Sequence, residues 1–296
     1  MKVILAVSGG IDSMVMLDMI YRGQLYSPHD IIVAHFDHGI RTNSAADAEF
    51  VAHIAEQHGL EFVLGSGELG PDASEAQARE ARYRFLSQLA KTRDATIFTA
   101  HHLDDLVESI AINYLRGTGW RGLAALDRAD IRRPLLEPDL LSANSSNYPP
   151  LDKAAVFRYA AQHRLHFRED STNSSDEYLR NRLRHQMNSL ALTRQKKLQL
   201  YTLWQKQKTL KRAIDQAVAE LLPPQGEAWQ RQWFHNLDGG IALELLRAGT
   251  LRAGISATRP QLKYFRQAIL TYASGKQFNL PNDRLVRLTK NHFWLD

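Results

Sequence analysis

The sequence contains no cysteine among its 296 residues. This absence excludes disulfide bonds, thiolate metal sites, iron–sulfur clusters held by cysteine and cysteine nucleophiles. It is also typical of a reducing compartment, so we expect a cytoplasmic protein. No apolar run approaches the roughly 18 residues that a membrane-spanning helix needs. We therefore expect no membrane segment, and we interpret the apolar run at residues 3–7 as a strand rather than a signal peptide.

Acidic residues are missing from one long stretch. Residues 178–212 contain ten Lys or Arg and no Asp or Glu. The net charge is −7 over residues 1–130, +8 over residues 131–215 and +4 over residues 216–296, which gives the total of +5. This asymmetry is typical of a catalytic body joined to an extension that binds a polyanion. The alternative is a solvated basic helix face.

Short apolar runs alternate with amphipathic stretches in the first half of the chain. We expect strands at residues 2–7, 31–36, 61–64, 96–101 and 131–136, and helices at residues 12–22, 44–58, 74–91 and 104–115. This order predicts an α/β fold with a Rossmann-like parallel sheet that helices cover on both faces. Ligands of such sheets bind beyond the carboxyl ends of the strands, where residues 8–13, 36–41 and 101–108 fall.

The second half of the chain lacks the regular alternation of strands and helices. Residues 139–150 are rich in Ser, Asn and Pro and predict a loop, and residues 151–164 predict a helix. Residues 178–219 lack Pro and Gly and predict one or two long helices. We expect a catalytic domain at 1–190, a basic helical linker at 191–222 and a small mixed α/β module at 223–296.

The segment Ser8-Gly9-Gly10-Ile11-Asp12-Ser13 lies between the first expected strand and the first expected helix. Glycines permit close approach of the backbone to a ligand, and a helix N-terminus attracts phosphate. The segment lacks the Gly-Lys-Ser/Thr of a Walker A loop. A carboxylate in a phosphate site repels its ligand unless Mg²⁺ bridges the two, which makes Asp12 the informative residue. The alternative is a tight turn with an Asp/Ser helix cap.

The pattern Ser-Gly-Gly-x-Asp-Ser after a first strand resembles the PP-loop of the N-type ATP pyrophosphatases. Members of this superfamily cleave ATP between the α- and β-phosphates and adenylate a carbonyl oxygen. The resemblance implies an adenine nucleotide alpha hydrolase-like fold, ATP as cofactor and Mg²⁺ on Asp12. The implied nucleotide contacts come from Ser8, Gly9, Gly10, Ile11, Asp12 and Ser13.

Further stretches narrow the resemblance. They are His35-Phe36-Asp37-His38-Gly39-Ile40-Arg41, Ala78-Arg79-Glu80-Ala81-Arg82-Tyr83, residues 100–108, residues 115–119, Glu169-Asp170-Ser171-Thr172-Asn173 and Arg180-Asn181-Arg182-Leu183-Arg184. Together, and in this order, they resemble the tRNA(Ile)-lysidine synthetases, densely over about residues 1–190. That family joins L-lysine to C2 of the wobble cytidine in the CAU anticodon of tRNA(Ile), through an adenylated cytidine, and releases AMP and pyrophosphate. The cousins that thiolate tRNA need catalytic cysteines, which this chain lacks.

Three carboxylates begin the helix expected at residues 104–115. Asp105 and Glu108 are three residues apart and Asp104 and Glu108 are four apart, so these side chains are neighbours. They could hold Mg²⁺ or an ammonium group. The resemblance implies that Asp105 and Glu108 bind the substrate lysine, and Asp105 could also take a proton from its amine. The alternative is an acidic first turn favoured by the helix dipole.

Arginines and histidines complete the expected site. The resemblance implies that Arg79 or Arg82 assists adenylation, and we choose Arg82; ion pairing with Glu75 or a nearby carboxylate is the alternative. We place Arg182 near the transferring phosphate as catalytic and Arg180 on the substrate, although Arg180, Arg182 and Arg184 are not distinguished. His35, His101 and Gly117 are further expected nucleotide contacts.

Two motifs are easily misinterpreted. His101 and His102 could contact ATP or the base, or belong to the core. On a strand they would point to opposite faces, which disfavours a metal site. Residues 117–122 match G-x-G-x-x-G but follow a helix rather than a strand, so we expect a flexible loop near the nucleotide in which Trp120 stacks on a base or packs.

The expected function is therefore lysidine formation on tRNA(Ile), with the module at 223–296 binding tRNA. The alternatives are another PP-loop ligase that acts on a different tRNA base or a small molecule, and a non-catalytic tRNA-binding protein. The oligomeric state stays open, and a homodimer is one of the options.

Overall fold

The computed structural model describes residues 1–39, 44–67, 70, 74–141, 149–168, 192–281 and 283–295. The chain divides into two compact units, Met1–Gln205 and Lys206–Asp296. The boundary falls within helix α7 (Arg194–Leu221). Within the described ranges, no helix has the length and apolar character needed to cross a membrane.

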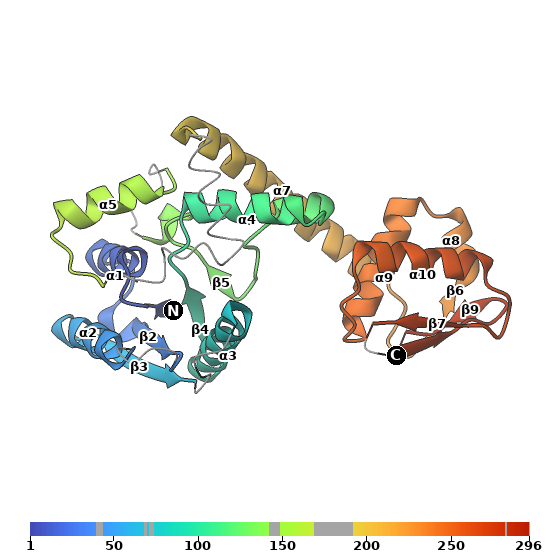
Figure 1. Cartoon of the computed structure of the whole chain (residues 1–296), viewed down its shortest axis with the longest axis horizontal. Coiled ribbons are helices and arrows are strands. Elements are labelled where there is room, and N and C mark those ends of the chain that lie inside the picture. Colours follow the sequence, from blue (N-terminus) through green and yellow to red (C-terminus); the bar gives the residue numbers. More distant parts are fainter. Residues whose placement is uncertain are drawn as a thin grey trace. The chain divides into compact units, whose positions relative to one another are not determined.

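The N-terminal unit is built on a five-stranded parallel sheet, as the sequence predicts (Figure 1). Its strands are β1 (Lys2–Ala6), β2 (Ile31–Asp37), β3 (Glu61–Ser66), β4 (Ala95–Phe98) and β5 (Ile131–Arg132). They lie in the order β3-β2-β1-β4-β5. The connecting helices are α1 (Ile11–Gly23), α2 (Ser44–Gln57), α3 (Glu75–Arg93), α4 (Leu103–Leu115) and α5 (Lys153–Gln162), with short 3-10 helices η1 (Pro28–Asp30), η2 (Gly119–Leu123) and η3 (Pro138–Leu140).

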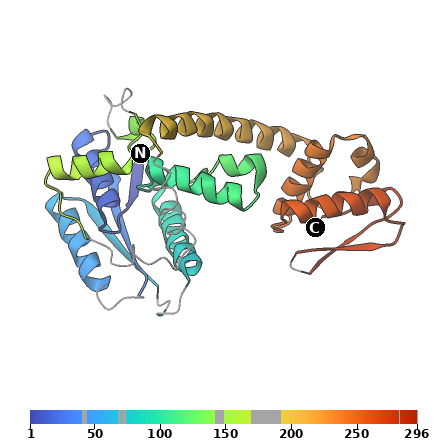
Figure 2. The same cartoon turned by 45° about the horizontal axis from the view of Figure 1, so that its top comes forward.

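Helices cover both faces of this sheet. Successive residues of a strand point to opposite faces, so Val3 and Leu5 pack with α1, α2 and α5, while Ile4 packs with α3. All three are fully buried, which is why the strand is a continuous apolar run rather than an alternating one. A separate apolar cluster joins α4 to the first turns of α7. The two helices cross in the view of Figure 1, and the first part of α7 lies beside α4 in Figure 2.

Two strands are shorter than the sequence predicts. We expected β4 to run from residue 96 to 101, but it covers Ala95–Phe98. His101 and His102 therefore do not lie on a strand, and the argument that they point to opposite faces of a sheet was wrong. The strand expected at 131–136 stops at Arg132, because Pro134 has no N–H group with which to continue a ladder.

The C-terminal unit has its own core. It contains the second part of α7, α8 (Arg231–Asn236), α9 (Gly239–Arg252) and α10 (Arg259–Thr271). Strand β6 (Trp229–Gln230) pairs with β9 (His292–Phe293), and β7 (Gln277–Leu280) pairs with β8 (Arg284–Arg287), both antiparallel. Four aromatic side chains of this core are fully buried: Trp229, Phe234, Phe265 and Phe293.

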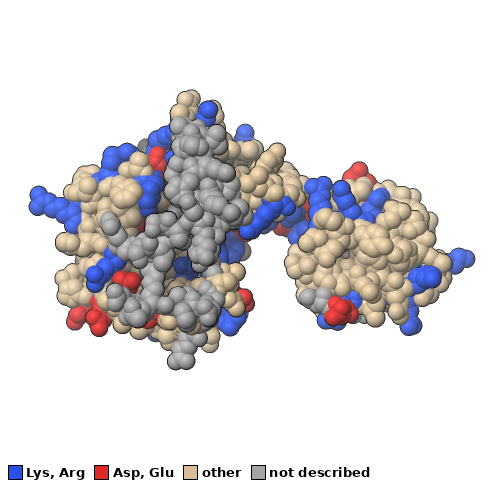
Figure 3. Space-filling model, viewed as in Figure 1, with Lys and Arg blue, Asp and Glu red and all other residues tan. Residues whose placement is uncertain are grey.

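One buried arginine ties this small unit together. Arg231 donates from its side chain to the carbonyl oxygens of Ile269 (2.8 Å), Thr289 (2.6 Å) and Tyr272 (2.8 Å). The guanidinium of Arg231 is therefore fully engaged by backbone carbonyls inside the unit. On the visible surface of this unit, Lys and Arg outnumber Asp and Glu (Figure 3).

Candidate nucleotide and substrate site

The segment between β1 and α1 turns through a glycine. Gly9 has φ of +88°, a conformation that residues with a Cβ rarely adopt. Gly10 is the N-cap of α1 and supplies no side-chain cap, and the hydroxyl of Ser13 donates to its carbonyl at 2.8 Å. Ser8 in turn donates its N–H to Ser13 Oγ at 3.2 Å. Hydrogen bonds within the segment thus hold its conformation, and the N-terminus of α1 lacks a side-chain cap.

Asp12, in the first turn of α1, is held by a lysine that the sequence analysis missed. Lys153 Nζ donates to both carboxylate oxygens of Asp12, at 2.7 and 2.8 Å. Lys153 is the first residue of α5, and α5 packs against α1 in the core through Val156 and Ala160. The one available signal was its place, directly after Asp152, at the start of a predicted helix. The ammonium therefore lies where the PP-loop and two helix N-termini meet.

His102 joins Asp12 to the acidic turn of α4. It is 4% exposed and forms the N-cap of α4. Its Nε2 lies 3.5 Å from Asp12 Oδ1, and its Nδ1 lies 3.4 Å from Asp105 Oδ2 and 3.7 Å from Asp104 Oδ2. The structure therefore brings the carboxylates of the PP-loop and of α4 to opposite sides of one imidazole ring.

The three carboxylates of α4 have different surroundings. Asp105 Oδ2 accepts the N–H of His102 at 2.9 Å, which caps the helix. Asp104 accepts the N–H of Lys153 at 2.7 Å and also pairs with Lys197 Nζ of α7. Glu108 is buried, with 3% of its surface exposed, one turn along α4 from Asp105. Asp105 and Glu108 are thus on neighbouring positions of α4, while Asp104 contacts Lys153 and Lys197.

The other expected site residues lie as follows. His35 is buried, and its Nδ1 hydrogen bonds to the carbonyl of Val7 at 2.9 Å, which requires the proton on Nδ1. His101 Nδ1 hydrogen bonds to Thr99 Oγ1 at 2.9 Å. On α3, the guanidinium of Arg82 lies 5.5 Å from the centre of the Tyr83 ring. His35 therefore fixes the end of the strand that leads into the PP-loop.

The G-x-G-x-x-G match, which we expected to form a flexible loop, forms the turn after α4 and a short 3-10 helix. Gly117 ends α4 with φ of +68°, and residues 119–123 form η2. Thr118 Oγ1 donates to Asn113 O at 3.0 Å, and Asn113 Nδ2 donates to Gly122 O at 3.1 Å. A Cβ on Gly122 would lie 1.9 Å from Thr118 Oγ1, so this glycine serves packing within the turn. Trp120 stacks with the guanidinium of Arg121, 4.6 Å from its ring centre.

Several predicted residues lie outside the described part of the chain. They are Ile40 and Arg41, the segment Glu169–Asn173, and the arginines Arg180, Arg182 and Arg184. The side chain of Glu75, named as an ion-pair partner for Arg79 or Arg82, is also outside it.

Among the described residues, the carboxylates suit a Mg²⁺ ion that is shared with substrate phosphates. Within the described residues, no three His, Asp or Glu side chains form a cage for a metal ion. Mg²⁺ is commonly held by one or two carboxylates together with substrate phosphates. Asp12, beside the uncapped N-terminus of α1, fits that arrangement, whereas an all-protein site does not.

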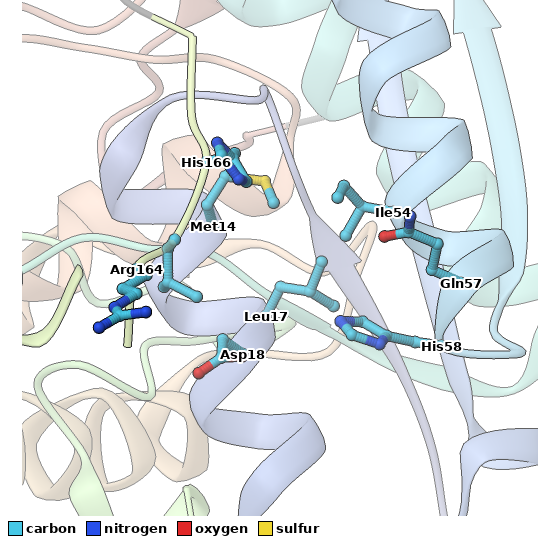
Figure 4. Close-up of a pocket in the computed structure, with 9 residues that line it drawn as sticks. Met14, Leu17, Asp18, Ile54, Gln57, His58, Arg164 and His166 are labelled. Atoms are coloured by element: carbon cyan, nitrogen blue, oxygen red, sulfur yellow. The ribbon is translucent and has the colours of Figure 1, made fainter. Parts of the chain in front are cut away.

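A small cavity lies elsewhere in the unit. Met14, Leu17 and Asp18 of α1 face Ile54 and His58 across it (Figure 4), and its volume is about 140 Å³. Ligand pockets are commonly roughly 300 Å³ or larger, so it is too small for a nucleotide. The carboxylate of Asp18 is already paired with Arg22 at 2.7 Å and accepts the Tyr159 hydroxyl at 2.9 Å. We assign no role in the site to this cavity.

Known proteins resemble the N-terminal part of this chain. The tRNA(Ile)-lysidine synthase of Solibacter usitatus is 36% identical over 190 residues, which cover 62% of this chain and 39% of that protein. That of Enterococcus faecalis is 34% identical over 189 residues, which cover 62% and 39%. The match thus spans about two fifths of the length of these relatives.

A solved structure shares the fold. A U34-tRNA thiolase from Methanococcus maripaludis with its [4Fe-4S] cluster superposes with a TM-score of 0.55 at 17% identity, over 71% of this chain and 72% of that one. This chain has no cysteine with which to hold such a cluster. Residues 1–191 match the PP-loop domain family. The chain therefore belongs to the PP-loop domain family, whose members bind ATP.

Proposed function

We propose that the protein is a ligase that uses ATP to join lysine to C2 of the wobble cytidine in a tRNA(Ile) with a CAU anticodon. One observation carries the proposal: the imidazole of His102 lies within 3.5 Å of Asp12, in the PP-loop, and of Asp105, on α4. The group expected to serve ATP and the group expected to serve lysine are therefore neighbours. The likeness to curated lysidine synthases over the same unit supports the assignment.

The PP-loop and Asp12 form the ATP site in this proposal. The N–H groups at the start of α1 bind phosphate oxygens, because a helix N-terminus carries partial positive charge. Asp12 would hold Mg²⁺ once the ammonium of Lys153, which occupies both of its oxygens in this structure, turns to the phosphates, and the ion would neutralise charge on them. Lys153, with its ammonium at the same corner, faces the pyrophosphate that leaves. Its positive charge stabilises the negative charge that develops there.

The reaction balances in two steps. O2 of the cytidine attacks the α-phosphorus of ATP, the bond to the β-phosphate breaks, and pyrophosphate leaves. The neutral lysine amine then attacks C2, the C2–O2 bond breaks, and O2 departs as part of AMP. Asp105 and Glu108 hold the lysine, and a carboxylate takes the proton that the amine loses. Positioning and charge account for both steps, without a covalent enzyme intermediate.

The remaining assignments are proposals of the same kind. Arg82 and Arg182 assist adenylation, Arg180 binds the tRNA, and His35, His101 and Gly117 border the nucleotide. The segment 191–222 and the module 223–296 bind tRNA, and residues 206–296 carry 14 Lys or Arg against 7 Asp or Glu. Such an excess of positive charge suits the phosphates of tRNA. We propose that the protein acts in the cytoplasm on tRNA(Ile) and L-lysine.

A different PP-loop ligase is the second candidate, because the fold is shared with a tRNA thiolase. The absence of cysteine argues against thiolation. Release of pyrophosphate without any lysine requirement would favour this second candidate.

The test is incorporation of labelled lysine into a tRNA(Ile) transcript with a CAU anticodon, in the presence of ATP and Mg²⁺. Asp105→Ala should reduce incorporation by about 100-fold or more, since the nucleophile loses its anchor and proton acceptor. Glu56→Ala is the matched control, because Glu56 is an exposed carboxylate on α2. Labelling that persists in Asp105→Ala would overturn the lysine site. Absence of labelling by the unaltered protein would overturn the function.

A further inference from the structure

The first part of α7 contacts the N-terminal unit through a single helical face. Arg194, Lys197, Tyr201 and Trp204 are spaced by three or four residues, so they lie along one side of the helix. Tyr201 donates its hydroxyl to Leu136 O at 2.7 Å, and Trp204 Nε1 donates to Ala125 O at 2.6 Å. Trp204 is 1% exposed. These two residues fix the helix against the unit.

The other two residues of this face reach the site. Arg194 Nη1 lies 2.6 Å from Asp152 Oδ2, and Lys197 Nζ pairs with Asp104. Asp152 is the N-cap of α5, and the residue after it is Lys153. Asp104 accepts the backbone N–H of the same Lys153 at 2.7 Å. Two connections therefore hold the start of α5 to α7. Arg194 pairs directly with Asp152, and Lys197 acts through Asp104.

Asp104 contacts both α5 and α7. One of its oxygens accepts from the backbone of Lys153, and the other pairs with Lys197. Both oxygens thus have cationic or N–H partners from within the chain. The carboxylate of Asp104 therefore links Lys197 of α7 to the start of α5.

We propose that Lys197 and Arg194 are positioning residues for the ATP site, which act through Asp104 and Asp152 to hold Lys153 against Asp12. The inference rests on the proposed assignment of residues 8–13 as the ATP site. It assigns to the basic helix α7 a role in nucleotide binding, in addition to any contact with tRNA.

Removal of the Lys197 ammonium would disturb the ion pair between Lys153 and Asp12 for an electrostatic reason. Asp104 and Asp12 approach the two nitrogens of one imidazole, at 3.7 and 3.5 Å. Without Lys197, the charge of Asp104 would lack its cation within this partly buried cluster, and an unpaired charge there is costly. Lys153 pairs with Asp12 through its ammonium and bonds Asp104 through its backbone N–H, so its ammonium would be drawn from Asp12 towards Asp104.

The experiment measures direct binding of ATP in the presence of Mg²⁺, alongside the KM for ATP and for lysine, in the full chain. Lys197→Met should weaken ATP binding about tenfold, and Lys197→Arg should restore most of it. Lys91→Met is the matched control, because Lys91 is an exposed lysine on α3, outside the segments proposed to bind tRNA. It should stay within about twofold of the unaltered protein, and the KM for lysine should not change in any of the three.

A second variant tests whether the unpaired charge of Asp104 causes the effect, and rescue by it would exclude loss of folding in Lys197→Met. Asp104→Asn keeps an acceptor for the N–H of Lys153 but loses the ion pair. It should bind ATP within about twofold of the unaltered protein, because no unpaired charge is left to draw Lys153 from Asp12. The double variant should recover most of the ATP affinity that Lys197→Met loses, because both changes act on the same pair.

Unaltered ATP affinity in Lys197→Met would overturn the inference, and so would a double variant that binds ATP as weakly as Lys197→Met. A rise in the KM for lysine with unchanged ATP affinity would also overturn it, since Asp104 would then be a lysine ligand. Because ATP binding is measured directly, a protein that binds ATP but transfers no lysine would fail the proposed function and still test this inference.

Discussion

At the scale of single residues, the site depends on groups whose local geometry is unusual. Gly9 has φ of +88°, and a Cβ there would make only ordinary contacts, the nearest at 3.5 Å from Val51. The requirement for glycine is therefore conformational rather than steric. The carbonyl of Gly9 also accepts the N–H of Arg168 at 2.9 Å, so the conformation of this residue sets where the PP-loop meets the segment after α5.

Gly9→Ala should therefore lower stability by about 1–2 kcal/mol and also weaken ATP binding. Gly59→Ala is the control, because Gly59 has φ of +64°, has open space around it and lies after α2, away from the loop. It should show a similar loss of stability with unchanged ATP affinity. Calorimetric unfolding and direct ATP binding measure the two effects. Equal ATP affinity in both variants would show that the conformation of Gly9 does not matter to the nucleotide.

At the scale of helices and strands, the site is made by the starts of three helices, α1, α4 and α5. Burial acts to raise the pKa of Asp152, the N-cap of α5, but the N–H of Ala155 and the guanidinium of Arg194 outweigh it and hold that pKa below its usual range. A carboxyl with a depressed pKa in the folded protein adds stability above its unfolded pKa. That stability is lost as the pH falls through the folded pKa.

Asp152→Asn keeps a capping side chain but removes this charge. It should lower the melting temperature at about pH 7, and the difference from the unaltered protein should shrink as the pH falls below about 4. Thermal unfolding followed across this pH range is the measurement. A difference that is independent of pH would mean that the ion pair with Arg194 does not contribute.

Much of this architecture could be predicted from the sequence. The alternation of apolar runs with amphipathic stretches predicts the parallel sheet, and Ser8–Ser13 predicts the turn from β1 into α1. The pairing of Asp12 with Lys153 could not be predicted, because the two residues are 141 positions apart and meet only when α5 packs on α1. The length of β4 was overestimated, because Thr99–His101 continue its polar and apolar pattern after the ladder ends at Phe98.

At the scale of the whole molecule, the charge is divided between parts of the chain. Residues 1–130 carry a net charge of −7, whereas residues 206–296 carry 14 Lys or Arg against 7 Asp or Glu. Arg231 is committed to three backbone carbonyls, so its charge is not available to a ligand. In our proposal the remaining basic groups bind the phosphate backbone of tRNA.

The affinity for tRNA(Ile) should then fall steeply with salt, by tenfold or more between about 50 and about 200 mM. The affinity for ATP should change far less over the same range. Asp105→Ala, which alters the lysine site, should leave tRNA affinity unchanged at each salt concentration. Filter binding with labelled transcript measures this, and an affinity for tRNA that ignores salt would contradict a polyanion-binding role for the basic segments.

The most direct test of the central claim is the chemical identity of the product. A tRNA(Ile) transcript with a CAU anticodon would be incubated with the protein, ATP, Mg²⁺ and lysine, digested to nucleosides and analysed by mass spectrometry. We predict one modified cytidine, heavier by lysine less water, located at the wobble position and absent when ATP is omitted. An unmodified wobble cytidine, with pyrophosphate released on another acceptor, would contradict the account and leave a PP-loop ligase of different substrate.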